Sequence, residues 1–388
     1  MQFQHLVIHK NNRFHSAFPE IIRLQNNDLV CVFRQAPLMP PEASKGTHNS
    51  KLTHNHVQDS SRIVLVRSKD DGISWDSENL VVIDQSDGTN DLNMAMISQV
   101  SSGEIIMNNH RWLLKMSDGE VSELKNSKMN LSKGRNKGPM DNIVFDSLYF
   151  SKSSDNGFTW EKPSQVSIAD FTYRAHTGKN GVVELPDRTW LLPFHGLASG
   201  DIQDRMFIAR SYDKGSTWTQ PSTVAYDPEQ KIGFHEPPLI RLPSGRLLTI
   251  IRTNDADGYL YQAYSDDDGW TWQGLKRCPM WGHPCNLLYL PTGRILCTYG
   301  YRKEPFGIRA AFSEDDGLTW DIDNEVIIRR DGLHRDLGYP ASILLSSGKI
   351  LTVYYFHDSE GIRYIGGSIW SENDVYQTYI TKHCSVNV

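Results

Sequence analysis

The chain has 388 residues, with 40 Lys and Arg against 46 Asp and Glu, and a formal net charge of −6 at pH 7. This mild acidic excess excludes a strongly basic surface, so we expect neither nucleic acid nor an anionic membrane as a partner. Hydrophobic residues make up 39% and aromatic residues 10% of the chain, which allows a large core and favours sheets over helix bundles. No apolar stretch approaches the length of a transmembrane helix, and none is predicted.

The N-terminus and the cysteines indicate a reduced, cytoplasmic protein. The first residues, MQFQH, do not form a basic segment followed by an apolar run, so no signal peptide is predicted. The expected location is the cytoplasm, or the periplasm or exterior if a signal segment has been removed. The five cysteines are Cys31, Cys278, Cys285, Cys297 and Cys384. They lack the spacing of a zinc site, and we expect reduced thiols buried in strands.

One octapeptide pattern, Ser-x-Asp-x-Gly-x-Thr/Ser-Trp, occurs five times. The copies, called Asp-boxes below, are Ser68–Trp75, Ser153–Trp160, Ser211–Trp218, Ser265–Trp272 and Ser313–Trp320. Each copy predicts a hairpin turn in which the Asp accepts hydrogen bonds from backbone N–H groups and the Gly has positive φ. The Trp is expected to cover the neighbouring sheet with its apolar face. These residues are therefore predicted to be structural.

A second repeat alternates with the boxes and reads as two apolar strands joined by a turn. Its six copies are Phe18–Arg34, Met94–His110, Lys179–His195, Glu236–Arg252, Pro284–Gly300 and Tyr339–Tyr355. One such hairpin followed by one box hairpin gives four strands, which is a propeller blade. We predict an all-β, six-bladed β-propeller with Asp-box hairpins that fills residues 1–388 as a single domain. The sixth blade lacks a box and is completed by Gly366–Trp370 with the tail, or by the N-terminal strand.

The repeat also predicts where a site would lie, because equivalent positions of the six blades converge on one axis. The column that starts the first strand holds Phe18, Met94, Lys179, Glu236, Pro284 and Tyr339. The column that ends the second strand holds Arg34, His110, His195, Arg252, Gly300 and Tyr355. Arginine and histidine side chains around one opening indicate a pocket for an anionic or polyhydroxylated ligand.

The box pattern, the six-fold repeat and the chain length resemble the sialidase (neuraminidase) superfamily over essentially the whole chain. The resemblance implies an exo-acting retaining glycoside hydrolase that removes a terminal sialic acid or related acidic sugar from a glycan. In that family a Tyr nucleophile is paired with a Glu, three arginines bind the sugar carboxylate, and an Asp is the acid/base. No cofactor and no metal are expected, because the neighbouring His54 and His56 have no evident third ligand.

Carried over position by position, the resemblance assigns Tyr339 as the nucleophile and Glu236 as its partner. Arg252 follows Glu236 at a spacing similar to the family's and is expected to bind the carboxylate. Arg302 or Arg309 is the candidate for a second binding arginine. His195, His235 and His283 are further substrate-binding candidates, although each could equally be a structural histidine.

Two elements depart from the family pattern. Ala17 stands where the family has an arginine, and Arg34 is a candidate replacement from a nearby position. The acid/base could be His56 or Asp59, because the loop before the first box does not fix the alignment. Two alternatives therefore remain: a propeller glycosidase or polysaccharide lyase for a different sugar, and a non-catalytic carbohydrate-binding propeller. The pair of Tyr339 and Glu236 argues against the last, provided that they lie within hydrogen-bond reach.

Overall fold

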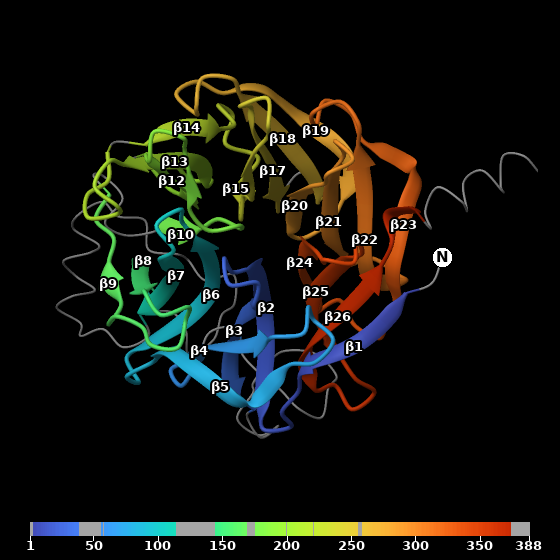
Figure 1. Ribbon diagram of the computed structural model, residues 1–388. Helices are drawn as coiled ribbons and strands as arrows, with labels where there is room; N and C mark the ends of the chain where they lie inside the picture. The colour runs from blue at the N-terminus through green and yellow to red at the C-terminus, as the bar shows by residue number, and fades with distance from the viewer. Residues whose placement is uncertain are drawn as a thin grey trace, which may run out of the picture.

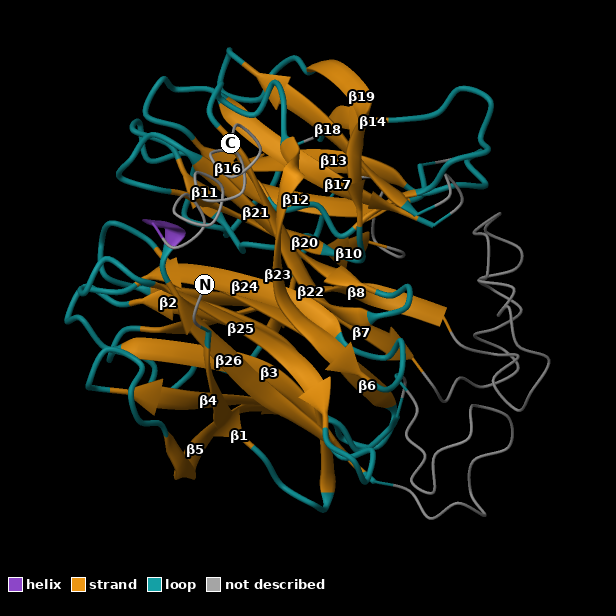
Figure 2. Cartoon of the chain, turned by 90° about the vertical axis from the view of Figure 1, so that its right-hand side faces the viewer, coloured by secondary structure: helices purple, strands orange, loops and turns teal. Residues whose placement is uncertain are grey.

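A computed structural model of the protein describes residues 3–38, 56, 58–113, 144–168, 175–198, 200–219, 221–254 and 258–373. Almost all regular structure in this part of the chain is β-strand, as Figure 2 shows from the side. The strands form six sheets that stand like blades around one central axis (Figure 1). The prediction of a six-bladed β-propeller is confirmed.

Blades 1, 2 and 5 are antiparallel meanders of four strands. Blade 1 consists of β2 (Phe14–Arg23), β3 (Leu29–Pro37), β4 (Arg62–Ser68) and β5 (Asp76–Gln85). Blade 2 consists of β6 (Asn90–Gln99), β7 (Ile105–Leu113), β8 (Val144–Ser153) and β9 (Ser164–Gln165). Blade 5 consists of β20 (Cys285–Tyr289), β21 (Ile295–Tyr301), β22 (Phe306–Ser313) and β23 (Asp321–Gly332).

Blades 3 and 4 have an inner strand that is split in two. In blade 3, β10 (Ala175–Thr177) and β11 (Val183–Glu184) both pair with β12 (Trp190–Gly196), followed by β13 (Arg205–Ser211) and β14 (Ser222–Ala225). In blade 4, β15 (Phe234–His235) and β16 (Leu239–Arg241) both pair with β17 (Leu247–Thr253), followed by β18 (Tyr259–Ser265) and β19 (Gln273–Trp281). The gap in blade 4 contains Glu236, so this residue is freed from the ladder at the axis.

The N-terminal strand closes the ring. Blade 6 consists of β24 (Gly338–Leu344), β25 (Ile350–His357), β26 (Arg363–Trp370) and β1 (Gln4–His9). β1 pairs antiparallel with β26, with Gln4 opposite Ile369 and Val7 opposite Gly366. Both segments that the sequence indicated are therefore used: Gly366–Trp370 lies in β26, and the N-terminal strand β1 is the outermost strand of the blade.

The Asp-boxes form the predicted turns. Each box begins at the last residue of the third strand of its blade. In the first box, Asp70 accepts hydrogen bonds from the Ser68 hydroxyl at 2.8 Å and from the Ser74 backbone N–H at 2.9 Å, and Gly72 has a φ of 86°. The backbone bond to the box Asp recurs in the other four boxes. The structural role predicted for these residues is confirmed.

Apolar side chains fill the spaces between neighbouring blades. One buried cluster joins Ile8 of blade 6 to Phe18 of blade 1 and Met94 of blade 2. The buried free thiols are Cys31, Cys278, Cys285 and Cys297, as expected, whereas Cys384 lies outside the described residues. Among the described residues, no helix has the length and hydropathy to cross a bilayer.

Ring closure by β1 makes a prediction about two adjacent residues. Ile8 is 2% exposed and packs in the cluster between blades, whereas Val7 on the other face of β1 is 57% exposed. Ile8→Ala should lower the free energy of unfolding by about 2–5 kcal/mol, because it leaves a cavity in the core. Val7→Ala should change it by less than about 0.5 kcal/mol. Thermal and urea unfolding measure both, and equal effects of the two substitutions would contradict this packing of β1.

Candidate active site

Three inner strands carry the same kink where they reach the axis. Phe18 in β2, Glu236 after β15 and Tyr339 in β24 have φ values of 60°, 48° and 50°, and each is followed by a proline. Positive φ is uncommon for residues with a side chain, and a following proline restricts the backbone further, so these conformations are strained. In β2 and β24 the pairing with the next strand shifts register at this point. Such bulges re-aim a side chain, here toward the axis.

Tyr339 and Glu236 meet at the axis, and their predicted proximity is confirmed. The Tyr339 hydroxyl donates a hydrogen bond to Oε1 of Glu236. Nη1 of Arg252 lies 2.5 Å from Oε2 of the same carboxylate and 3.3 Å from the Tyr339 oxygen. The side chains of Glu236 and Arg252 are 12% and 18% exposed, so the three groups form a mostly buried set that remains open to a ligand.

The charges of this set determine where its proton lies. Burial would raise the pKa of the Glu236 carboxyl group, but the charge of Arg252 and hydrogen bonds from Tyr339 and Arg252 outweigh burial and lower this pKa to about 2. Burial and the negative charge of Glu236 raise the pKa of the Tyr339 phenol, although Arg252 and Arg302 oppose the shift. In the resting site the proton is therefore on Tyr339, and Glu236 is ionised.

A second arginine lies beside Tyr339. Arg302 follows β21, and its Cζ lies 5.7 Å from the centre of the Tyr339 ring. It donates hydrogen bonds from Nη2 to the Tyr355 hydroxyl at 3.1 Å and from Nε to the main-chain oxygen of Leu337 at 3.0 Å. These contacts hold the guanidinium group in place. The structure thus brings Arg252 and Arg302 together around Tyr339.

His283 faces the same two arginines from the start of blade 5. Burial, followed by the charges of Arg252 and Arg302, lowers the pKa of His283 to about 3, so its ring is neutral. Nδ1 of His283 and Nε of Arg252 are buried and make no hydrogen bond to any residue that the structure describes. Buried polar atoms normally have a partner, so each of these two atoms is a candidate for a hydrogen bond to a bound ligand or water.

His56 reaches the site from the loop between β3 and β4. Its ring centre lies 5.4 Å from that of Phe18, which in turn lies 4.6 Å from the Tyr339 ring. Nε2 of His56 lies 3.1 Å from Oδ1 of Asp336, and the histidine side chain is 46% exposed. His56 is therefore placed where it can exchange a proton with a ligand or with solvent. His54 lies outside the described residues.

Two residues at this edge differ from the sequence-based expectations. Asp336 was not a candidate, yet it accepts hydrogen bonds from the Tyr355 hydroxyl at 2.8 Å and from Nε of Arg363 at 3.1 Å, in addition to its contact with His56. Asp59 lies in a half-buried turn ahead of β4, where its main-chain oxygen accepts a hydrogen bond from a serine hydroxyl. Of the two acid/base candidates, His56 is the one with a ring contact to Phe18, which lies against Tyr339.

Two candidate arginines hold strands together instead. Arg34 is 0% exposed, and its Nη2 lies 2.6 Å from Asp91, which ties blade 1 to blade 2. The expectation that Arg34 replaces the missing binding arginine is therefore corrected, because a ligand cannot reach it. Arg309 on β22 lies 2.5 Å from Glu325, and its Cζ lies 3.3 Å from the Tyr301 ring centre. The structure does not bring Arg309 to the Tyr339 pocket.

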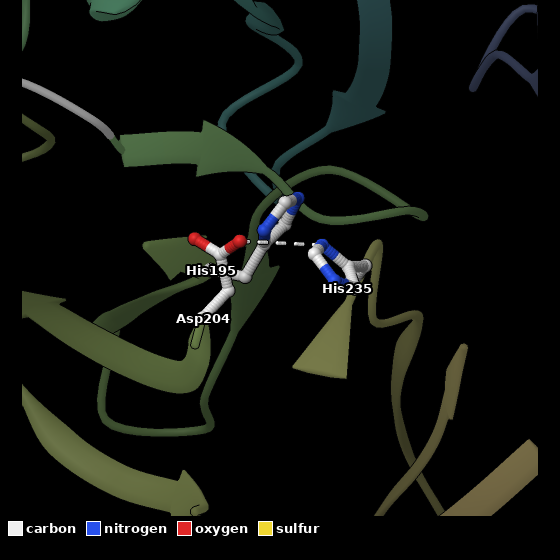
Figure 3. A group of neighbouring side chains, drawn as sticks. All are labelled: His195, Asp204 and His235. Carbon is white, nitrogen blue, oxygen red and sulfur yellow. Dashed lines mark ion pairs between the residues drawn. The ribbon is translucent and has the colours of Figure 1, made fainter. Parts of the chain in front are cut away.

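His195 and His235 gather with an aspartate that the sequence did not indicate. Nδ1 of His235 lies 3.6 Å from Oδ2 of Asp204, and the His195 ring lies 5.0 Å from the His235 ring (Figure 3). A row of rings continues from there, with His176 stacked on His195 at 4.6 Å and His110 at 4.6 Å from His176. Asp204 and His176 lie outside the two repeat columns and were not among the predicted site residues.

Ala17 is fully buried, and the neighbouring Phe18 covers the face of Tyr339. The arginine that sialidases carry at this point has no counterpart here. On the side of blade 1, an aromatic ring and not a guanidinium group therefore lies beside Tyr339. This is the clearest difference in the site from the family pattern.

Comparisons with known proteins agree with this fold. A family model described as a BNR repeat-like domain matches residues 142–352, which is more than half of the chain. No curated protein is significantly similar in sequence.

Solved structures extend the comparison to the whole chain. A protein of unknown function from Dyadobacter fermentans superimposes with a TM-score of 0.79 at 29% identity, over 95% of this chain and 98% of that one. A Hadza microbial sialidase has a TM-score of 0.64 at 15% identity, over 93% of this chain and 66% of that one. The intramolecular trans-sialidase from Ruminococcus gnavus has a TM-score of 0.62 at 14% identity, over 94% and 96%. The chain therefore has the β-propeller fold that these sialidases share, and it belongs to the BNR repeat-like family.

Proposed function

We propose that this protein is an exo-acting retaining glycoside hydrolase of the sialidase type, which removes a terminal sialic acid or related acidic sugar from a glycan. Its sialidase-like fold supports a glycoside hydrolase-like chemistry. The observation that carries the proposal is the hydrogen-bonded set of Tyr339, Glu236 and Arg252 at the axis.

The protein contains a second set of Tyr, Glu and Arg, and comparison with it shows which features distinguish the Tyr339 set. Tyr299 donates to Glu325 at 2.6 Å, and Arg309 contacts the same carboxylate, but Tyr299 is 0% exposed in the interior of blade 5. The hydrogen-bond pattern alone is therefore no sign of catalysis. The Tyr339 set differs because it lies on kinked backbone at the axis, beside a further arginine, Arg302.

The proposed substrate accounts for a tyrosine nucleophile. A sialic acid carries a carboxylate on its anomeric carbon, which repels a carboxylate nucleophile but not a neutral phenol. Because Arg252 holds the pKa of Glu236 at about 2, Glu236 is a weak base in the resting site. A substrate carboxylate bound to Arg252 would weaken that hold and raise the proton affinity of Glu236. Substrate binding would thus prepare the base that Tyr339 needs.

The reaction then follows two balanced steps. In the first, the Tyr339 oxygen bonds to the anomeric carbon, its proton passes to Glu236, and the acid protonates the leaving oxygen as the glycosidic bond breaks. In the second, water attacks the same carbon and gives a proton to the conjugate base, while the bond to Tyr339 breaks and the phenol recovers its proton. His56 is the proposed acid/base, with Asp59 as the alternative.

Arg252 and Arg302 are the proposed binding groups for the sugar carboxylate. Both lie beside Tyr339, and Nε of Arg252 is a buried donor that no described residue engages. A carboxylate oxygen is a strong acceptor for such a guanidinium donor. The neutral ring of His283 is suited to hydrogen bonding with a sugar hydroxyl.

A different sugar is the second candidate, and the surroundings of Ala17 favour it. With Ala17 buried and Phe18 against Tyr339, the described contacts place Arg252 and Arg302 beside Tyr339, whereas sialidases use three arginines. Such a pocket could serve a glycosidase or lyase for another sugar.

The proposal is tested by hydrolysis of a panel of aryl glycosides that includes the sialoside, with wild type and Tyr339→Phe. We expect release from the sialoside or another acidic sugar, and a loss of at least about a thousandfold in Tyr339→Phe because the nucleophile is removed. Tyr299→Phe is the matched control, since it removes a hydroxyl from the other buried Tyr–Glu pair. Unchanged turnover in Tyr339→Phe would exclude the nucleophile, and release from a neutral sugar alone would favour the second candidate.

The acid/base assignment is tested by the leaving group. His56→Ala should lower kcat/KM about 10²–10⁴-fold on a natural glycoside, whose leaving oxygen needs a proton, and far less on a nitrophenyl glycoside. Asp59→Ala, assayed in parallel, should leave the ratio of kcat/KM values on the two substrates unchanged. If His56→Ala lowers kcat/KM equally on the two substrates and Asp59→Ala lowers it unequally, Asp59 and not His56 is the acid/base.

A further inference from the structure

The geometry points to a binding site for a transition-metal dication of the zinc class, formed by His195, Asp204 and His235. One ligand atom from each side chain lies within 4.8 Å of the others. The three side chains point toward one another in Figure 3. This inference does not depend on the proposed hydrolase activity.

The ligands are held by fixed parts of blades 3 and 4. His195 is next to the last residue of β12, Asp204 directly precedes β13, and His235 ends β15. The loop before β13 is anchored by Asp201, whose two carboxylate oxygens each lie 2.6 Å from a guanidinium nitrogen of Arg205. The N–H of the residue before His235 donates to the main-chain oxygen of Asp204 at 2.9 Å. The site is therefore preorganised without a ligand.

The spacing fits coordination better than a direct hydrogen bond. The 3.6 Å between Nδ1 of His235 and Oδ2 of Asp204 exceeds the usual hydrogen-bond range of roughly 2.7–3.2 Å. Two ligands on a tetrahedral zinc, at bonds of about 2.1 Å, are separated by about 3.4 Å. Oδ1 of Asp204 is also buried and makes no hydrogen bond to any described residue. A modest rotation of the imidazole rings would bring all three groups onto one ion.

The residue types select the class of ion. Imidazole nitrogens suit zinc, nickel, copper and iron, whereas magnesium and calcium prefer oxygen ligands. Three protein ligands leave at least one coordination position open, as in catalytic rather than structural zinc sites. The side chains of His235 and Asp204 are 14% and 15% exposed, so that position can reach solvent or a bound molecule.

Neighbouring residues support the ligand rings. His176 stacks on His195 with an angle of 20° between the rings, which fixes the plane of that ring. Gly233 leaves room for the His235 ring, because a Cβ at position 233 would lie 2.8 Å from Nε2 of His235. His235 pairs with Arg252 across the sheet and precedes Glu236, so a bound dication would adjoin the Tyr339 pocket.

Calorimetric titration of chelator-treated protein with Zn²⁺ tests this site. We expect one equivalent per chain in wild type, and a loss in Asp204→Asn and His235→Gln greater than the roughly 10–100-fold typical of an outer-shell change. His5 is exposed in β1, far in the sequence from the three ligands, and gives the matched control: His5→Gln should bind Zn²⁺ as wild type does. Zn²⁺ should raise the unfolding temperature of wild type but not of the two ligand variants.

A further variant guards against loss of folding. Gly233→Ala keeps all three ligands but displaces the His235 ring, so it should weaken Zn²⁺ binding at an unfolding temperature, without metal, near that of wild type. Absence of saturable binding in wild type, or equal binding in Asp204→Asn and wild type, would overturn the site. Because the readout is binding, failure of this inference and failure of the hydrolase proposal are separable.

Discussion

Closure of the ring is the constraint on which the rest of the molecule depends. Once β1 has paired with β26, the inner strands of all six blades surround one axis. The residue at the start of each inner strand then faces the equivalent residues of the other blades. Lys179 shows how demanding that position is: it is fully buried and reaches from blade 3 to Glu20 of blade 1, 3.2 Å away. A buried ammonium group needs such a partner. The same convergence brings Tyr339 of blade 6 against Glu236 of blade 4.

Backbone strain and charge then specialise one side of the axis. The kinks at Phe18, Glu236 and Tyr339 cost of the order of 1–3 kcal/mol each, and they persist because the packing of neighbouring blades holds them. Arg252 contacts the Glu236 carboxylate and Arg302 lies beside the Tyr339 ring, so two guanidinium groups flank this Tyr–Glu pair and favour an anionic ligand. The Tyr299 set in blade 5 has neither the kink nor the second arginine, which is why we regard it as structural.

The features that recur from blade to blade could be predicted from the sequence. The Asp-boxes predicted the turns, and the shared column predicted that Tyr339 and Glu236 meet. Contacts between blades away from the axis could not be predicted in this way, because a column locates the end of a strand but not the direction of its side chain. Arg34 therefore seemed available for a ligand, whereas its partner Asp91 lies 57 residues away in the next blade. The candidate metal ligands come from three separate segments, so their proximity has no local signal in the sequence.

Tyr339 is expected to become covalently bonded to the sugar, and trapping that intermediate is the most direct test of the proposed mechanism. A fluorine on the sugar ring destabilises the oxocarbenium-like transition states and so slows both steps of the reaction. If the leaving group is also fluoride, the first step is slowed less than the second, and the intermediate accumulates. Intact-mass and peptide mass spectrometry should then find one sugar per chain, attached to Tyr339. An adduct on another residue, or rapid turnover of the parent glycoside with inversion and without an adduct, would contradict the account.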